Sequence, residues 1–202
     1  MHGDGTGKNQ GDDAGGSISL VNAALGGDRP SFERLITIHQ EGIFRMVYAR
    51  MQSRADAEDV VQDVFLSAYR NLASLREPEL FKAWLYRIAL NRVRDFMRKR
   101  KLMSLFGFTS KEADEDYPDP GPDGFDHLAA RRFWSRINDF LSSLPPLQRE
   151  VFRLRFIDDL GIHEIAVALG RNESTVKTHL YRALDKFRTE GTQYGMSPQE
   201  ES

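Results

Sequence analysis

The sequence of 202 residues contains no cysteine, which excludes disulfides, thiolate zinc sites and cysteine nucleophiles. It has no run approaching the ~18–20 consecutive apolar residues that a membrane-spanning helix requires. Its first residues, MHGDGTGKNQGDDAGGS, lack the basic and apolar blocks of a signal peptide. We therefore expect a cytoplasmic protein with no membrane insertion, long enough for one or two domains with buried cores.

Sequence features of enzymes are also missing. No P-loop, GxSxG motif or paired-carboxylate site stands out. The histidines are scattered without the spacing of metal ligands, at His2, His39, His127, His163 and His179. We predict no catalytic residue, no metal site and no cofactor.

Charge is nearly balanced overall, with 28 basic and 30 acidic residues, but it is unevenly distributed. Residues 82–101 hold eight basic residues and one acidic residue, whereas residues 111–126 hold seven acidic residues and one basic residue. A protein that touches phosphate in one place and other partners elsewhere shows such a pattern. The net charge therefore does not exclude nucleic-acid binding.

The chain reads as two helical segments separated by a break. Residues 102–125 contain three prolines, three glycines and an acidic run, which indicate a linker. Neither an internal repeat nor sustained β alternation is present. The predicted fold is all-α, with two small helical domains joined by a flexible acidic linker. The predicted parts are a disordered tail over 1–16, a domain over 17–101, the linker over 102–125, a domain over 126–190 and a polar tail over 191–202.

In the first domain, a helix is predicted over 54–70, with Ser53 as its N-cap. Its apolar stripe contains Ala57, Val60, Val61, Val64, Phe65 and Ala68. The opposite face carries Asp59, Gln62, Asp63, Leu66 and Arg70. Acidic residues near a helix N-terminus have a structural origin in the macrodipole, and one exposed leucine is ordinary. Alternatively, Leu66 is the centre of a protein-binding patch.

A second helix is predicted over 80–101, with Pro78 in its first turn. Its apolar side holds Phe81, Leu85, Ile88, Ala89 and Phe96. The other side carries Arg87, Asn91, Arg94, Arg98 and Lys101, with no acid on the same line, since Asp95 lies off it. This basic stripe is either a solvated face or a phosphate-binding surface. Trp84, at the margin, either completes the core or meets bases.

The second domain is predicted to contain helices near 146–158, 162–169 and 173–188. Gly170 suits the left-handed residue that ends a helix, and Asn172 suits the N-cap of the next. The last helix has a buried stripe of Val176, Leu180, Ala183, Leu184 and Phe187. Its exposed arc of Thr175, Lys177, Thr178, Tyr181 and Arg182 is rich in donors for phosphates and base edges. The alternative to this helix-turn-helix reader is a plain three-helix module.

These segments resemble a known family. AEDVVQDVFLSAYRNL and FKAWLYRIALNRVRDFMRKRK resemble region 2 of bacterial extracytoplasmic-function (ECF) sigma factors, and LPPLQREVFRLRFIDDLGIHEIAVALGRNESTVKTHLYRALDKF resembles their region 4. The similarity spans roughly residues 17–190 in the family's order. Two departures are Gly161, where relatives often have Ser or Thr, and EPELF at 77–81, where a glycine-containing loop is commoner.

The resemblance implies a sigma factor that directs promoter-specific initiation, in a stress or envelope response under an anti-sigma factor. The implied contacts with the β and β′ subunits of the RNA polymerase core involve Asp59, Gln62, Asp63, Leu66 and Arg70. Recognition and melting of the −10 element are implied for Trp84, Arg87, Asn91, Arg94, Arg98 and Lys101. Recognition of −35 is implied for Arg171, Ser174, Thr175, Lys177, Thr178, Tyr181 and Arg182. A duplex-binding regulator that works without polymerase is the alternative, but it leaves the faces of 54–70 and 80–101 unexplained.

Overall fold

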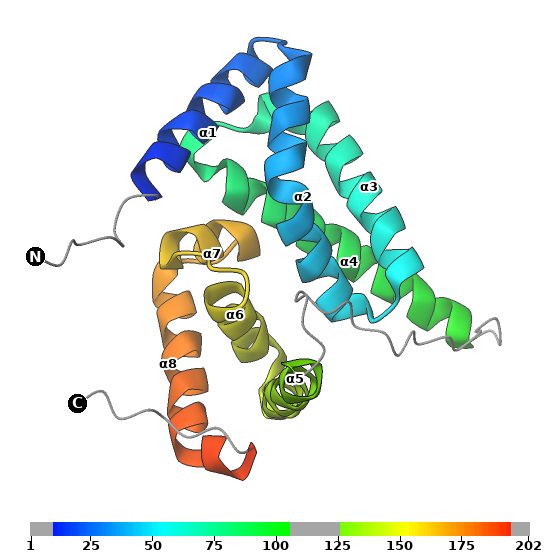
Figure 1. Ribbon diagram of the computed structural model, residues 1–202, viewed down its shortest axis with the longest axis vertical. Helices are drawn as coiled ribbons and strands as arrows, with labels where there is room; N and C mark the ends of the chain where they lie inside the picture. The colour runs from blue at the N-terminus through cyan, green and yellow to red at the C-terminus, as the bar shows by residue number, and fades with distance from the viewer. Residues whose placement is uncertain (1–9, 106–125, 195–202) are drawn as a thin grey trace, which may run out of the picture. The chain divides into compact units, whose positions relative to one another are not determined.

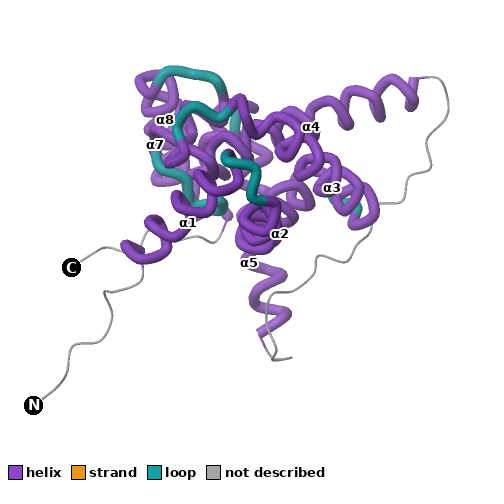
Figure 2. Tube along the Cα trace, turned by 90° about the horizontal axis from the view of Figure 1, so that it is seen from above, coloured by secondary structure: helices purple, strands orange, loops and turns teal. Residues whose placement is uncertain are grey.

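The computed structural model describes residues 10–105 and 126–194, which fall into two units that we treat separately (Figure 1). The described residues contain helices joined by loops and turns, and no strand (Figure 2). The predicted all-α fold with two helical domains is therefore confirmed. The first unit contains α1 (Gln10–Leu25), α2 (Arg29–Met51), α3 (Arg54–Asn71), η1 (Leu72–Ser74), η2 (Pro78–Leu80) and α4 (Phe81–Leu105). The second contains α5 (Asp126–Ser143), α6 (Pro146–Phe156), α7 (Ile162–Leu169), α8 (Glu173–Glu190) and η3 (Gly191–Tyr194).

Side-chain caps set the start of two helices in the first unit. The Asp28 carboxylate accepts a hydrogen bond from the backbone N–H of Ser31 (3.0 Å) at the start of α2. The Ser53 hydroxyl accepts one from Asp56 N–H (3.4 Å) at the start of α3, as predicted. Between them Gln52 adopts a left-handed conformation (φ 56°) and its N–H donates to Tyr48 O, which ends α2. These caps satisfy backbone groups that a helix end leaves unpaired.

The core of the first unit lies between α2, α3 and α4, which contact one another, while α1 packs on α2. Figure 1 shows these helices side by side. Fully buried side chains come from each of the three, including Leu35 and Ile43 of α2, Val64 of α3 and Leu85 of α4. Burying such a side chain contributes about 1.5–3 kcal/mol. Phe81, Leu85 and Ala89 of the predicted α4 stripe are thus buried, whereas Ile88 and Phe96 are half-buried. The opposite faces of α3 and α4 are left to solvent.

An aromatic cluster forms the core of the second unit. Phe140 of α5 is completely buried and packs edge-on against Phe152 of α6 and Phe187 of α8, with ring centroids 5.5 and 5.3 Å away. Leu141, Leu144 and Ala183 complete the buried cluster. Because the rings join three helices, α8 is held against a rigid support rather than only against its neighbour α7.

The turn between α7 and α8 has the predicted geometry of a helix-turn-helix. Gly170 is left-handed (φ 62°), and the backbone N–H of Arg171 donates to Ala166 O (2.9 Å) to close the end of α7. Asn172 then caps α8, since its Oδ1 accepts from Thr175 N–H (2.8 Å). A side chain at position 170 would be strained because this conformation favours glycine. The predicted short helix, tight turn and second helix are all confirmed.

Several predicted boundaries differ from the structure. The tail prediction is wrong for residues 10–16, because α1 begins at Gln10; anchoring of this helix by buried Val21 and Ala24 outweighs the weak helix propensity of its glycines. The linker prediction is wrong for residues 102–105, because α4 runs to Leu105 and LMSL contains no helix breaker. Residues 191–194 form a 3-10 turn. Predictions for 1–9, 106–125 and 195–202 lie outside the described residues.

The end of α6 also differs. The helix predicted to reach 158 ends at Phe156, and Asp159 adopts a positive φ of 51°. The backbone N–H of Leu160 donates to Leu154 O (2.9 Å), and the Leu160 side chain is completely buried. Burial of this leucine therefore requires the chain to turn back earlier than periodicity suggests.

Candidate nucleic-acid and partner-binding surfaces

The face of α3 predicted to bind a partner is exposed. Asp59, Gln62, Asp63 and Arg70 are exposed, and 46 % of Leu66 is accessible. The opposite stripe is buried as predicted, apart from Val61, which is half-buried. Within the described parts of the chain, neither Asp59 nor Asp63 belongs to an ion pair. The face therefore presents unpaired charge around one apolar side chain.

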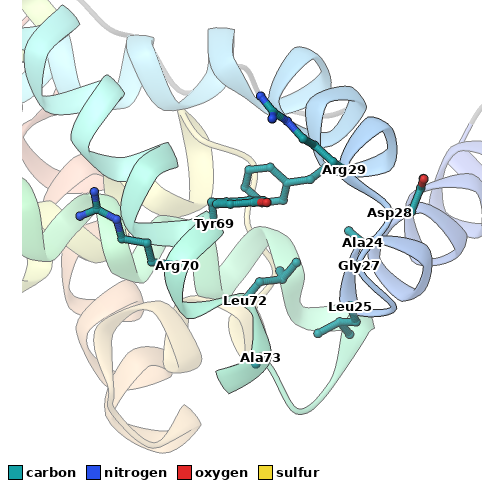
Figure 3. A pocket seen from close by; sticks show the side chains of 10 residues that line it. Ala24, Leu25, Gly27, Asp28, Arg29, Tyr69, Arg70, Leu72 and Ala73 are labelled. Carbon is teal, nitrogen blue, oxygen red and sulfur yellow. The ribbon is translucent and has the colours of Figure 1, made fainter.

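A hollow of about 410 Å³ adjoins this face (Figure 3). Its walls are Ala24, Leu25, Gly27, Asp28, Arg29, Phe32, Tyr69, Arg70, Leu72 and Ala73. Tyr69, on α3, is 54 % exposed and its ring lies 5.1 Å from that of Phe32 on α2. Sequence analysis did not single out Tyr69, although its position three residues after Leu66 places it beside that residue on the helix surface. The apolar part of this surface is therefore larger than predicted.

The basic stripe of α4 is also exposed. Arg87, Asn91, Arg94, Arg98 and Lys101 all face solvent, on the side away from buried Leu85 and Ala89. Trp84 is half-buried, with its ring 5.8 Å from that of Phe81. Trp84 therefore contributes to the core and also remains partly accessible to a base. The sequence had left open which of these two roles it has.

The expectation that the stripe has no acidic partner is wrong for Arg98. Its Nη2 lies 2.6 Å from Asp95 Oδ1, three residues earlier. Residues three apart are neighbours on a helix, so Asp95 reaches the stripe despite lying off its axis. Arg94 is oriented by the Asn91 side chain, whose Oδ1 accepts from Arg94 Nη2 (2.9 Å). Asn91, Arg94, Asp95 and Arg98 line a shallow groove.

The arc of α8 lies opposite its core contacts. Lys177, Thr178 and Arg182 are exposed, as are Arg171 and Ser174 near the turn, and 68 % of Tyr181 is accessible. Thr175 is half-buried. Val176, Leu180 and Ala183 are buried as predicted, whereas Leu184 and Phe187 are half-buried. The structure therefore brings the predicted residues together on one outward surface.

Their hydrogen bonds divide these residues into two kinds. Ser174 Oγ donates to Asn172 Oδ1 (2.9 Å), and Thr178 Oγ1 donates to Ser174 O (2.9 Å). Within the described residues, the side chains of Tyr181 and Arg182 make no hydrogen bond or ion pair. Arg182 therefore has its whole guanidinium fork available for a ligand, whereas the two hydroxyls already have local acceptors.

Two residues that sequence analysis missed, His163 and Glu173, meet beside this arc. Because an ionised carboxylate only accepts hydrogen bonds, His163 Nδ1 of α7 is the donor to Glu173 Oε1 of α8 (3.0 Å). Glu173 Oε2 lies 3.4 Å from Lys177 Nζ. The hydrogen bond from His163, and then that from Lys177, lower the pKa of the Glu173 carboxyl. The spacing of Glu173 and Lys177 was a readable signal for their pairing, but the contact with His163 depends on the fold.

The described residues show no other evident site. Among residues 10–105 and 126–194, no group of three or more His, Asp or Glu side chains could hold a metal ion. Nor does this part of the chain include a helix both long and apolar enough to cross a membrane.

Comparison with known proteins gives a consistent result. Residues 35–102 match the family model of Sigma-70 region 2, and residues 135–187 match that of Sigma-70 region 4. The chain is 31 % identical to the RNA polymerase sigma factor SigV of Bacillus subtilis over 80 % of its length and 92 % of that protein. It is 29 % identical to the ECF RNA polymerase sigma factor SigW of the same organism, over 80 % of this chain and 89 % of SigW. The solved structure of CnrH with the cytosolic domain of CnrY matches with a TM-score of 0.63 and 26 % identity, over 88 % of this chain and 98 % of CnrH.

Proposed function

Because the chain belongs to the ECF family of RNA polymerase sigma factors, we propose that its two helical units divide promoter recognition between them. Sigma factors are transcription initiation factors, not catalysts: they bind the polymerase core and direct it to promoters. In this chain, the first unit binds the core through α3 and the −10 element through α4. The second unit reads the −35 element through α8.

The observation that carries this proposal is the presence of two chemically different exposed faces on one unit. The α3 face surrounds Leu66 with unpaired carboxylates, which suits a protein partner. The α4 face carries Arg87, Arg94 and Arg98, which suit phosphates. A regulator that only binds duplex DNA needs the second face but not the first. The unit is therefore built to hold a protein and DNA at once.

Substitutions on the α3 face should weaken binding to core polymerase without unfolding the protein. Leu66→Asp and Asp63→Arg change exposed side chains and leave Val64 and Phe65 in the core. If Leu66 anchors the contact, each variant should lose about 1–2 kcal/mol of binding free energy, or roughly 5–30-fold in affinity. Titration of labelled protein with core polymerase measures this directly.

Ile38→Asp is the matched control for this experiment. Ile38 is an equally exposed aliphatic residue, 49 % accessible, but it lies on α2. Its substitution should leave core affinity unchanged. Parental affinity in both α3 variants would show that the face is only a solvated surface.

Substitutions on α8 should change −35 binding in two distinguishable ways. Lys177→Ala should weaken binding without changing which bases are preferred, because a lysine acts as a point charge on phosphate. Arg182→Ala should relax the preference at one base by about 1–3 kcal/mol if the free guanidinium makes a bidentate base contact. Sequencing of promoters bound by the holoenzyme from a pool randomised at −35 reports the base preference, and titration of one promoter with the holoenzyme reports the loss of affinity.

The control for the α8 variants is Arg188→Ala, which removes an exposed cation from the last turn of the same helix. Arg188→Ala should leave the preferred sequence unchanged. It should reduce the affinity by less than Lys177→Ala does. Base preferences in the Lys177 and Arg182 variants identical to those of the parent, at parental affinity, would remove both residues from the reader.

The proposal also includes a protein that holds the chain inactive in the cytoplasm. CnrH, which this chain resembles in structure, was solved with the cytosolic domain of CnrY. An anti-sigma factor, released in a stress or envelope response, would act on this chain by covering the surfaces that bind core or DNA. Co-purification of the full chain from its native cells tests for such a partner.

A further inference from the structure

Glu173 is an acidic residue beside the cationic side chains of α8. It is the first residue of α8 and lies about one turn before Lys177, which is proposed to contact DNA phosphate. A carboxylate there lies close to the path of DNA phosphates, which repel it. Its side chain remains 44 % exposed, so the carboxylate is not buried for structural reasons. Its place at the N-terminal end of the helix is favourable for a negative charge, but that end is already capped.

Both oxygens of this carboxylate have a partner. His163, from α7, donates to Oε1 (3.0 Å), and Lys177, one turn further along α8, reaches Oε2 (3.4 Å). The imidazole fixes the carboxylate from the neighbouring helix, and the carboxylate in turn holds the ammonium. These hydrogen bonds lower the pKa of the Glu173 carboxyl below its ordinary value, because they stabilise its ionised form.

The turn itself does not depend on this network. The N-terminus of α8 is capped by Asn172, which accepts from Thr175 N–H (2.8 Å), and the end of α7 is closed by the bond from Arg171 N–H to Ala166 O (2.9 Å). Removing the charge of Glu173 therefore leaves the turn's backbone hydrogen bonds in place. The network acts on a flexible side chain, that of Lys177, more than on the backbone.

We propose that Glu173, held by His163, is a positioning residue that restrains Lys177 and so limits sequence-independent binding of α8 to DNA phosphate. The proposal rests on the proposed role of α8 as the −35 reader. An exposed ion pair is worth under about 1 kcal/mol, so a correctly placed phosphate can displace Glu173 from Lys177. Elsewhere on DNA, the internal carboxylate competes with the phosphate and reduces the gain from counterion release.

Glu173→Gln should strengthen non-specific binding. The probe is a short duplex of random sequence, titrated with the full chain over a range of salt concentrations. We expect the variant to bind about two- to five-fold more tightly at low salt, the size of one exposed ion pair. The slope of log affinity against log salt should become more negative by about 0.9, as for one additional phosphate contact.

The matched control is Glu190→Gln. Glu190 lies on the same helix and pairs with Lys186 at the same spacing and a similar distance (3.5 Å), but near the C-terminal end and away from the arc. The two variants carry the same change in net charge. If both increase affinity equally, the effect is general electrostatics and the proposal is overturned. Equal thermal unfolding temperatures for parent and Glu173→Gln establish that the fold is unchanged.

A double-mutant cycle tests whether Glu173 acts through Lys177. In a Lys177→Ala background, Glu173→Gln should have no effect on the salt slope. An effect that persists there would mean direct repulsion of phosphate by the carboxylate and would overturn the positioning role. His163→Ala should reproduce part of the Glu173→Gln effect, because it releases the carboxylate.

The cycle also separates this inference from the proposed function. If Lys177→Ala alone leaves both DNA affinity and salt slope unchanged, Lys177 does not contact phosphate, and the proposed −35 role of this residue fails first. If Lys177→Ala weakens binding while Glu173→Gln behaves like the parent, only the positioning role is overturned.

Discussion

Alanine at both Arg94 and Arg98 is expected to reduce the yield of open promoter complex by about 100-fold on duplex templates. Each hydrogen bond to a charged group makes a net contribution of about 1.5–3 kcal/mol to the binding free energy. Loss of two such bonds therefore removes about 3 kcal/mol or more. Both arginines are exposed on α4 and line the same groove. Sequence analysis found no ATPase motif in this chain, so the cost of unpairing must be offset by binding the separated strand. A basic groove on the helix that also carries the half-buried ring of Trp84 suits that task.

A template with a pre-melted bubble at −10 should remove most of this defect, because the unpairing cost is already met. Permanganate reactivity on duplex and bubble templates, at one salt concentration, gives the open-complex yield of each. Alanine at Arg34 and Arg45, two exposed arginines of α2, is the matched control for the loss of two charges. If the bubble restores nothing, the stripe serves general phosphate binding, and strand opening belongs to another part of the unit.

The ion pair of Arg98 with Asp95 affects how the basic stripe of α4 binds DNA. In the free protein the arginine is held at 2.6 Å from the carboxylate, so part of its interaction with DNA replaces an existing contact. The exchange is inexpensive because the pair is exposed, with roughly three-quarters of the Arg98 side chain accessible (73 %). Arg94 and Arg98 are therefore oriented by neighbouring side chains, whereas Arg87 and Lys101 make no hydrogen bond or ion pair within the described residues, as expected from the sequence.

Local features of this fold could be predicted because their causes are local. Ser53, Gly170 and Asn172 act on backbone groups within three or four residues, so the chain itself shows where α3 and α8 begin and where α7 ends. The buried stripes follow from helical periodicity in the same way. The residues of α3, α4 and α8 that lie outside these stripes form the exposed faces. Most candidate contact residues could therefore be predicted from the sequence.

What could not be predicted depends on contacts between elements. The hydrogen bond from His163 to Glu173 joins α7 to α8 between residues ten positions apart. It depends on the geometry of the turn between them. Likewise, the hollow beside Tyr69 exists only because α1 and the start of α2 pack next to the end of α3. Helical periodicity predicted too long a helix at the end of α6, where burial of Leu160 requires the chain to turn earlier. Contacts between helices, and the hollow, therefore required the structure, whereas ion pairs within one helix follow from residue spacing.

The central claim, that the two units read a promoter only when the polymerase core fixes their spacing, is tested most directly by comparing DNA binding with and without core. Each unit has a small DNA-binding surface, and joining two weak contacts raises affinity by about 10²–10⁴ when their separation matches the sites. The measurement is the equilibrium affinity for a promoter duplex and for a scrambled duplex, at one salt concentration. We predict that the free chain binds both weakly and alike, and that with core it prefers the promoter by at least about 100-fold. Tight, sequence-specific binding by the free chain that core does not change would contradict the account.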